Sequence, residues 1–168
     1  MSNVLGSRKT LIVEGPDDAT VLNKLSRVMA ASGKPCLAED VYIWPAQGAA
    51  KTPMFAGFII GHGWPGGALL DGDDEGQNAA KKIRELYKNV DEKKFFVGTI
   101  ADALELRDRP LTIEDVLGVE FYTEVVAAAY KIQIEANDVD SDWTKPLPSR
   151  FDALLESRGH GISTKVGS

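Results

Sequence analysis

The amino-acid sequence predicts an α/β protein with a mostly parallel, four-stranded sheet that is covered by helices on both faces. Two observations lead to this prediction. Short apolar runs rich in β-branched residues alternate with longer segments in which apolar residues recur at helical spacing. Glycine, proline or acidic residues end several of the apolar runs, and such alternation of strands and helices is typical of parallel sheets.

The first strand and helix bring two acids together. The strand covers Thr10–Val13, and the helix runs from Pro16, which suits a first turn, to about Ala31. If the helix begins near residue 15, Glu14 and Asp18 lie about one turn apart and can converge on one ion, whereas the neighbouring Asp17 points elsewhere. We expect this helix to bury an apolar stripe made of Val21, Leu22, Leu25, Val28 and Met29.

The remaining elements follow the same alternation. Further strands are predicted at 41–44, 68–70 and 95–100, with a short buried helix at 54–60 and an amphipathic helix at 77–87 between them. Beyond Pro110, Thr112 is placed to cap a helix that carries Glu114 and Asp115 in its first turn. A strongly helical segment covers 121–135, a polar loop follows, and a final short helix includes 151–155.

Length and composition suit one domain, which we place at 1–168 with a core from about 8 to 120 and a helical extension from about 120 to 168. Of the 168 residues, 43% are hydrophobic and 26% are charged, which is ordinary for a globular protein. No apolar run approaches the roughly 20 residues that span a bilayer, and residues 1–9 lack the apolar core of a signal peptide, so we expect a cytoplasmic protein with no membrane contact.

Residue counts and net charge exclude several classes of function. A single cysteine excludes an internal disulfide, and with only two histidines the chain is a poor candidate for a zinc site. The net charge of −6 argues against a passive nucleic-acid coat, because such binding needs a surplus of lysine and arginine. An acidic protein can still act on a polyanion if metal ions bridge the two.

Four carboxylates fall within five positions in the segment Asp71-Gly72-Asp73-Asp74-Glu75, between a predicted strand and helix. In an open α/β sheet, ligands bind outside the carboxyl ends of the strands. Like charges packed together raise the free energy of the folded state unless a cation compensates, which suggests a hard metal such as Mg²⁺. The alternative is a solvated acidic turn that caps the following helix.

Spacing divides this turn into two parts. In an extended segment residues two apart face the same way, so Asp71 and Asp73 can share a metal while Gly72 faces away and permits close packing. We expect Asp74 and Glu75 to begin the next helix. The acids that follow the strands or lie near them supply enough oxygens for two divalent ions, as phosphodiester hydrolysis by two metals requires: Glu14, Asp18, Asp71, Asp73 and Glu114.

Two of these motifs resemble those of the Toprim family. Leu11-Ile12-Val13-Glu14-Gly15-Pro16-Asp17-Asp18 resembles the family's glutamate motif, and Asp71-Gly72-Asp73-Asp74-Glu75-Gly76 resembles its DxDxxG motif. Within the family the chain looks most like the nucleases of the OLD (overcoming lysogenization defect) group. Like them it has an acid four residues after the first glutamate, and the segment Thr112-Ile113-Glu114-Asp115 after the fourth strand.

The resemblance implies a Rossmann-like Toprim fold and an endonuclease that binds two Mg²⁺ or Mn²⁺ ions and nicks or cleaves DNA. It implies that Glu14 and Asp18 serve one metal, that Asp71 bridges or neighbours both, and that a second group serves the other metal: Asp73, Thr112 and Glu114. It also suggests a late lysine near the transition-state charge, for which Lys165 is the positional candidate. The implied catalytic residues are Glu14, Asp71, Asp73 and Lys165.

Three questions stay open at the level of sequence. OLD proteins carry an amino-terminal ATPase, whereas this chain has no GxxxxGK[ST] phosphate loop, so the alternatives are a stand-alone protein that works with a separate ATPase and a fragment of a larger assembly. The same acids would serve a phosphoesterase acting on RNA or nucleotides. A Toprim module retained only for interaction is the third interpretation, and nothing in the sequence indicates an oligomeric state.

Overall fold

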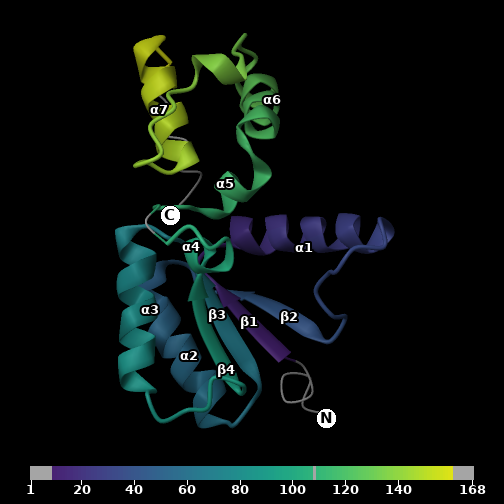
Figure 1. Cartoon of the computed structure of the whole chain (residues 1–168), viewed down its shortest axis with the longest axis vertical. Coiled ribbons are helices and arrows are strands. Elements are labelled where there is room, and N and C mark those ends of the chain that lie inside the picture. Colours follow the sequence, from purple (N-terminus) through teal and green to yellow (C-terminus); the bar gives the residue numbers. More distant parts are fainter. Residues whose placement is uncertain (1–8, 108, 161–168) are drawn as a thin grey trace.

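The computed structural model describes residues 9–107 and 109–160, and within them it confirms the predicted α/β architecture. Its four strands are β1 (Lys9–Val13), β2 (Val41–Pro45), β3 (Gly66–Leu70) and β4 (Phe95–Thr99). They form one sheet in the order β2-β1-β3-β4, and every neighbouring pair is parallel. All four carboxyl ends therefore meet at one edge, which faces the upper part of the molecule in Figure 1.

Helices cover both faces of the sheet, as the sequence predicts. The helices α2 (Thr52–Gly61) and α3 (Asp74–Leu86) pack on one face, where Ile59 and Ile83 join Leu70 in the main hydrophobic cluster. Leu69 points to the opposite face, since alternate residues of a strand face opposite ways. There it belongs to a second cluster that includes Leu22 of α1 (Pro16–Ala31).

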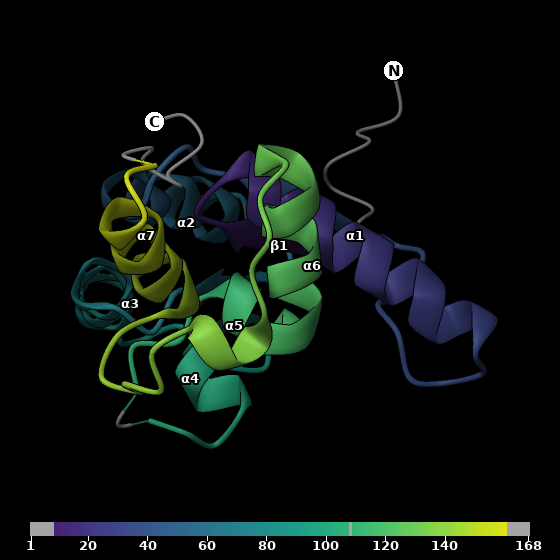
Figure 2. The ribbon, with the colours of Figure 1, turned by 90° about the horizontal axis from the view of Figure 1, so that it is seen from above.

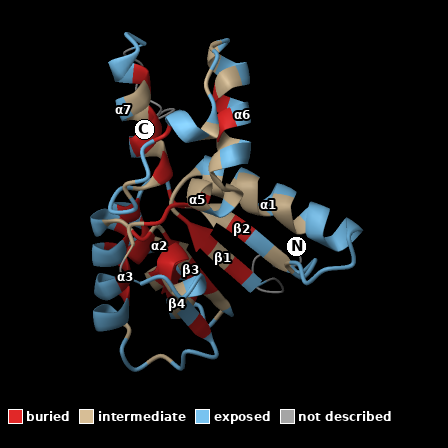
Figure 3. Cartoon of the chain, turned by 45° about the horizontal axis from the view of Figure 1, so that its top comes forward, coloured by how far each residue is buried: buried red, intermediate tan, exposed pale blue. Residues whose placement is uncertain are grey.

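The helix α1 has the predicted bounds, but it does not bury its apolar stripe. None of its residues is buried, and Val28 remains 64% exposed near the far end. The reason is geometric, because α1 runs past the sheet and only its first turns lie over β1 and β2 (Figures 1 and 3). The expectation that the whole stripe is buried was therefore wrong.

A set of shorter helices continues the chain beyond β4. These are α4 (Ile100–Ala103), α5 (Ile113–Leu117), α6 (Val119–Tyr130) and α7 (Leu147–Ser157), with two 3₁₀ turns elsewhere, η1 (Ala49–Lys51) and η2 (Ala136–Asp138). Figure 2 looks down on the carboxyl edge of the sheet and shows α4, α5 and α6 in front of it. The helical extension thus stands over the edge where the predicted site lies.

The extension has a hydrophobic cluster of its own, in which Val126 and Val139 pack with Phe151 and Leu155 of α7. The predicted helix over 121–135 was too long at its carboxyl end. The helix α6 stops at Tyr130 because Lys131 adopts the left-handed conformation, and Ile132 and Ile134 then reach the same cluster from a loop. No helix within the described residues is long and apolar enough to cross a membrane.

Candidate functional site

Two of the predicted acids lie side by side at the carboxyl edge of the sheet. Glu14 directly follows β1 and Asp71 directly follows β3, and these strands are neighbours. The backbone N–H of Asp71 donates a hydrogen bond of 3.0 Å to Oε1 of Glu14. The glutamate side chain is therefore directed across the sheet edge toward the end of the next strand, and its second oxygen makes no hydrogen bond within the described part of the chain.

Asp18 lies in the first turn of α1, one turn after Glu14, as its spacing predicts. Its Oδ2 accepts a hydrogen bond of 2.7 Å from the backbone N–H of Gly15, which fixes the start of the helix. Asp18 is half-buried, whereas its neighbour Asp17 is exposed. The structure thus separates these two adjacent acids in the way the helical spacing indicates.

Asp73 has a structural role in the turn that follows β3. Its Oδ1 accepts a hydrogen bond of 2.9 Å from the backbone N–H of Gly76 and so caps α3. The helix begins at Asp74, and Asp74 and Glu75 are exposed in its first turn, as expected. One oxygen of Asp73 is therefore committed to the helix, which leaves the other for a ligand.

The two glycines of this turn allow close packing around the acids. A Cβ at Gly72 would lie 2.9 Å from both the side chain of Ala101 and the backbone N of Leu111. A Cβ at Gly76 would collide with the carbonyl oxygen of Asp71 and come within 2.7 Å of Oε1 of Glu14. The DxDxxG spacing thus matches a physical requirement, because any larger residue at Gly76 would push α3 away from the two acids.

Burial and mutual repulsion raise the pKa of the two acids at the strand ends. The pKa of Glu14 rises to about 7, chiefly because the carboxyl is buried, although the hydrogen bond from Asp71 opposes the rise. The pKa of Asp71 rises to about 9, again first because of burial and then because of repulsion from Glu14 and Asp18. At neutral pH Asp71 therefore holds a proton, and Glu14 holds one about half of the time, whereas ordinary carboxyls have lost theirs.

Glu114 extends this group from a distant part of the sequence. Its charge raises the pKa of Asp18 after burial, and it contributes to the raised pKa of Asp71. It also raises the pKa of Tyr122, for which burial is the larger cause. Glu114 lies in the first turn of α5, as predicted, so this helix brings the fifth predicted acid toward the sheet edge.

Thr112 precedes α5 and is held by a residue that the sequence reasoning did not assign to the site. The Thr112 hydroxyl donates a hydrogen bond of 3.1 Å to Oδ2 of Asp115, which also accepts from the Thr112 backbone N–H. Asp115 further accepts from the backbone N–H of Leu147, the first residue of α7. The Thr-x-x-Asp spacing of a capping box was the signal for this role. Thr112 itself is 7% exposed.

Chemically, the donor set suits a hard divalent ion, because carboxylate oxygens are the ligands that Mg²⁺ and Mn²⁺ prefer. As the side chains lie, no three His, Cys, Asp or Glu residues of the described ranges are placed so that they could hold a metal ion. The five acids therefore share one electrostatic environment without forming a finished coordination shell. Lys165, the predicted lysine, lies outside the described residues.

Beside the acids lies a cavity of about 410 Å³ that is lined by both acidic and basic side chains. Its lining includes two acids, Asp73 and Asp74, and two arginines, Arg107 and Arg109. The two arginines were not predicted as site residues, although they are the only basic residues in the acidic segment from Asp102 to Glu124. Arg107 pairs with Asp102 across 3.3 Å.

Comparison of the chain with protein-family models, with curated proteins and with solved structures gives no match. The Toprim resemblance therefore stays a prediction from the two sequence motifs, which the four-stranded parallel sheet sets at one edge.

Proposed function

We propose that this protein is a divalent-metal-dependent nuclease that hydrolyses phosphodiester bonds in DNA. One observation carries the proposal: acids from two adjacent parallel strands and the helices beside them share one half-buried environment in which their charges repel. Burial, and after it this repulsion, raise the pKa of Asp71 to about 9 and that of Glu14 to about 7. Such an arrangement destabilises the metal-free fold. With a cation bound, the same acids would stabilise the fold instead.

The proposed ligands divide as the resemblance implies. Glu14 and Asp18 would hold one ion, and Asp71 would be shared with a second. The second ion would have a further group of ligands: Asp73, Thr112 and Glu114. Two divalent ions bound there would activate a water for attack on phosphorus and stabilise the leaving oxygen. The proposal includes DNA as the substrate and a separate ATPase protein as a partner.

The residues of the chain have definite tasks in this scheme. Glu14 and Asp18 each accept a backbone hydrogen bond, so one oxygen of each is fixed while the other remains for an ion. Gly76 keeps the start of α3 close to Glu14 and Asp71. The arginines that line the neighbouring cavity, Arg107 and Arg109, are of the residue type that binds phosphate oxygens.

The test is supercoiled plasmid incubated with Mg²⁺ or Mn²⁺. Wild-type protein should convert it to nicked or linear DNA, and EDTA should abolish the reaction. Glu14→Gln and Asp71→Asn should each lower the rate about 100-fold or more, because even residues that only support metal ligands cost 10- to 100-fold. Asp17→Asn is the matched control, because Asp17 is an exposed acid next to Asp18 that lines neither cavity and should leave the rate within about threefold.

The same assay separates the competing functions. Intact plasmid together with cleavage of structured RNA would move the substrate to RNA. Equal nicking by the wild type and both site variants would identify a contaminating nuclease. Intact DNA and RNA, together with no thermal shift of the wild type in 10 mM Mn²⁺, would refute the metal-dependent activity and favour an interaction module.

A further inference from the structure

The helical extension holds a buried arginine whose charge is not balanced by a carboxylate. Arg150, in the first turns of α7, is only 4% exposed. Its Nε donates to the carbonyl oxygen of Asp140, while its Nη1 has no hydrogen-bond partner among the described residues. Arg150 also takes part in no ion pair within those ranges. Burying an unpaired charge is costly, so this position calls for an explanation.

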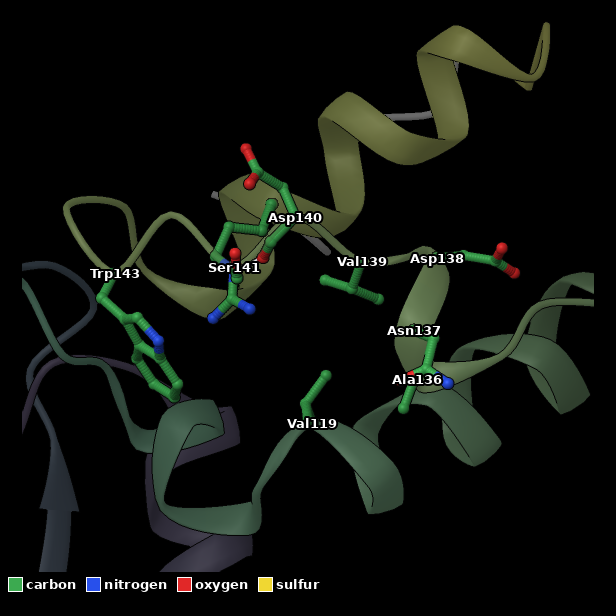
Figure 4. Close-up of a pocket in the computed structure, with 9 residues that line it drawn as sticks. Val119, Ala136, Asn137, Asp138, Val139, Asp140, Ser141 and Trp143 are labelled. Atoms are coloured by element: carbon green, nitrogen blue, oxygen red, sulfur yellow. Dashed lines mark hydrogen bonds between the residues drawn. The ribbon is translucent and has the colours of Figure 1, made fainter.

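Arg150 lines a cavity of about 480 Å³ between the start of α6 and the segment that joins η2 to α7 (Figure 4). Two acids belong to the same wall, but neither neutralises the arginine. Asp138 pairs with Arg158 across 2.8 Å, and Asp140 accepts a hydrogen bond from the backbone N–H of Asp142. Figure 4 shows both carboxylates directed away from Val119 and Trp143. The cavity therefore has a positive group on its wall.

Trp143 links this cavity to the one beside the acids. The guanidinium carbons of Arg150 and Arg109 each lie 4.9 Å from the centroid of the Trp143 ring. Arg109 also lines the cavity that contains Asp73. A tryptophan ring that contacts two guanidinium groups restricts where both can point. The two arginines are thus held at one ring, one facing each cavity.

We infer that Arg150 and Arg109 form a phosphate-binding site for the nucleic-acid strand, with Trp143 as the positioning residue for both. A guanidinium offers paired N–H donors that match phosphate oxygens, and a buried one binds without the competition of water. The strand would extend from the acids past Arg109 to the Arg150 cavity. This inference rests on the proposed function for its substrate, whereas the positive site itself follows from the burial of Arg150 and its place at the Trp143 ring.

The test is binding of a fluorescein-labelled single-stranded DNA 12-mer, followed by anisotropy in EDTA so that no bond is cut. Arg150→Met should weaken binding about 10- to 100-fold, the range for removal of a hydrogen bond to a charged group. The dependence of log Kd on log salt should become shallower by about one for each phosphate that is no longer neutralised. Arg27→Ala, which removes an exposed arginine from α1, should change Kd less than about twofold.

Folding is checked separately, because Arg150 is buried. If Arg150→Met unfolds, Arg109→Met and Trp143→Ala serve in its place, since Trp143 is 49% exposed and neither residue belongs to the buried core. Each should weaken binding at least about fivefold with a preserved circular dichroism spectrum. Folded variants that all bind the 12-mer as tightly as Arg27→Ala would overturn the inference.

Competitors distinguish the source of the phosphate. Unlabelled 12-mer should displace the probe at micromolar concentration, whereas inorganic phosphate and thymidine monophosphate should not do so below millimolar concentration. Displacement by free phosphate as readily as by the 12-mer would overturn the assignment to a strand. Binding that depends on Arg150 in a protein that cuts no plasmid would retain this site and reject the nuclease. If Arg150→Met nicks plasmid with an unchanged KM, the nuclease would be retained and the Arg150 phosphate-binding site rejected.

Discussion

The burial of Asp71, together with the repulsion among the site acids, predicts that a substitution at this position stabilises the metal-free protein. Asp71→Asn keeps the shape of the side chain and leaves intact the backbone N–H that donates to Glu14. It removes a carboxyl whose pKa is about 9 in the fold against an ordinary value of 3.8. Folding at pH 8 therefore requires wild-type Asp71 to take up a proton, or to remain charged against its neighbours, and the asparagine has neither cost.

The size of the effect follows from the same values. The interval between 3.8 and pH 8 is about four pH units, and each corresponds to about 1.36 kcal/mol, which gives a ceiling near 6 kcal/mol. Part of this free energy belongs to the coupling with Glu14, because a neutral Asp71 makes ionisation of Glu14 easier. We therefore expect Asp71→Asn to raise the free energy of unfolding by about 2 kcal/mol, or the Tm by roughly 4–8 °C for a chain of this length.

The assay is thermal and urea unfolding in EDTA at pH 8 and at pH 4. At pH 4 the difference should shrink to about 0.5 kcal/mol, because the uptake of a proton by Asp71 on folding then costs little. Asp74→Asn removes a charge from the same turn and should be neutral or destabilising by about 0.5 kcal/mol, since Asp74 favours the start of α3. An Asp71→Asn protein less stable than wild type at pH 8 would refute the electrostatic account of the site.

Three further predictions test the surroundings of the site. Between about pH 4 and pH 9 the metal-free protein should lose stability as pH rises. The raised pKa values of Glu14, Asp18 and Asp71 make the folded state bind more protons than the unfolded state does. Urea midpoints that increase across this pH range would contradict the prediction. Gly76→Ala should destabilise by about 1–3 kcal/mol through overpacking, whereas Gly61→Ala, whose Cβ meets nothing within 4 Å, should stabilise α2 by about 0.5 kcal/mol in the same thermal assay. Thr112→Val should cost about 1 kcal/mol by removing the hydrogen bond to Asp115, and an unchanged urea midpoint would show that this cap contributes nothing.

Local sequence signals predicted the sheet and the positions of three of the acids well, because each signal lies within one element. A β-rich run that stops at Glu14, and another that stops at Asp71, place both side chains at the carboxyl edge of a parallel sheet without further information. The helical spacing between Glu14 and Asp18 works in the same way. Gly72 also fulfils its predicted packing role, since the strand-to-helix turn leaves no room for a Cβ at this position.

What the sequence could not reveal depends on contacts between distant segments. The exposed end of α1 follows from the length of the helix relative to the sheet, which periodicity does not encode. The end of α6 depends on one left-handed residue, Lys131. Arg150 and Trp143 were missed because their significance lies in a contact with each other and with Arg109, more than 30 positions earlier.

The carboxylate of Asp115 connects the helical extension to the segment that carries Glu114. Asp115 holds Thr112 at the start of α5 and the backbone of Leu147 at the start of α7. The residue before it is Glu114, whose charge raises the pKa of Asp18 and of Asp71. Movement of α7 would therefore change the position of Glu114 and with it the charge that the strand ends experience.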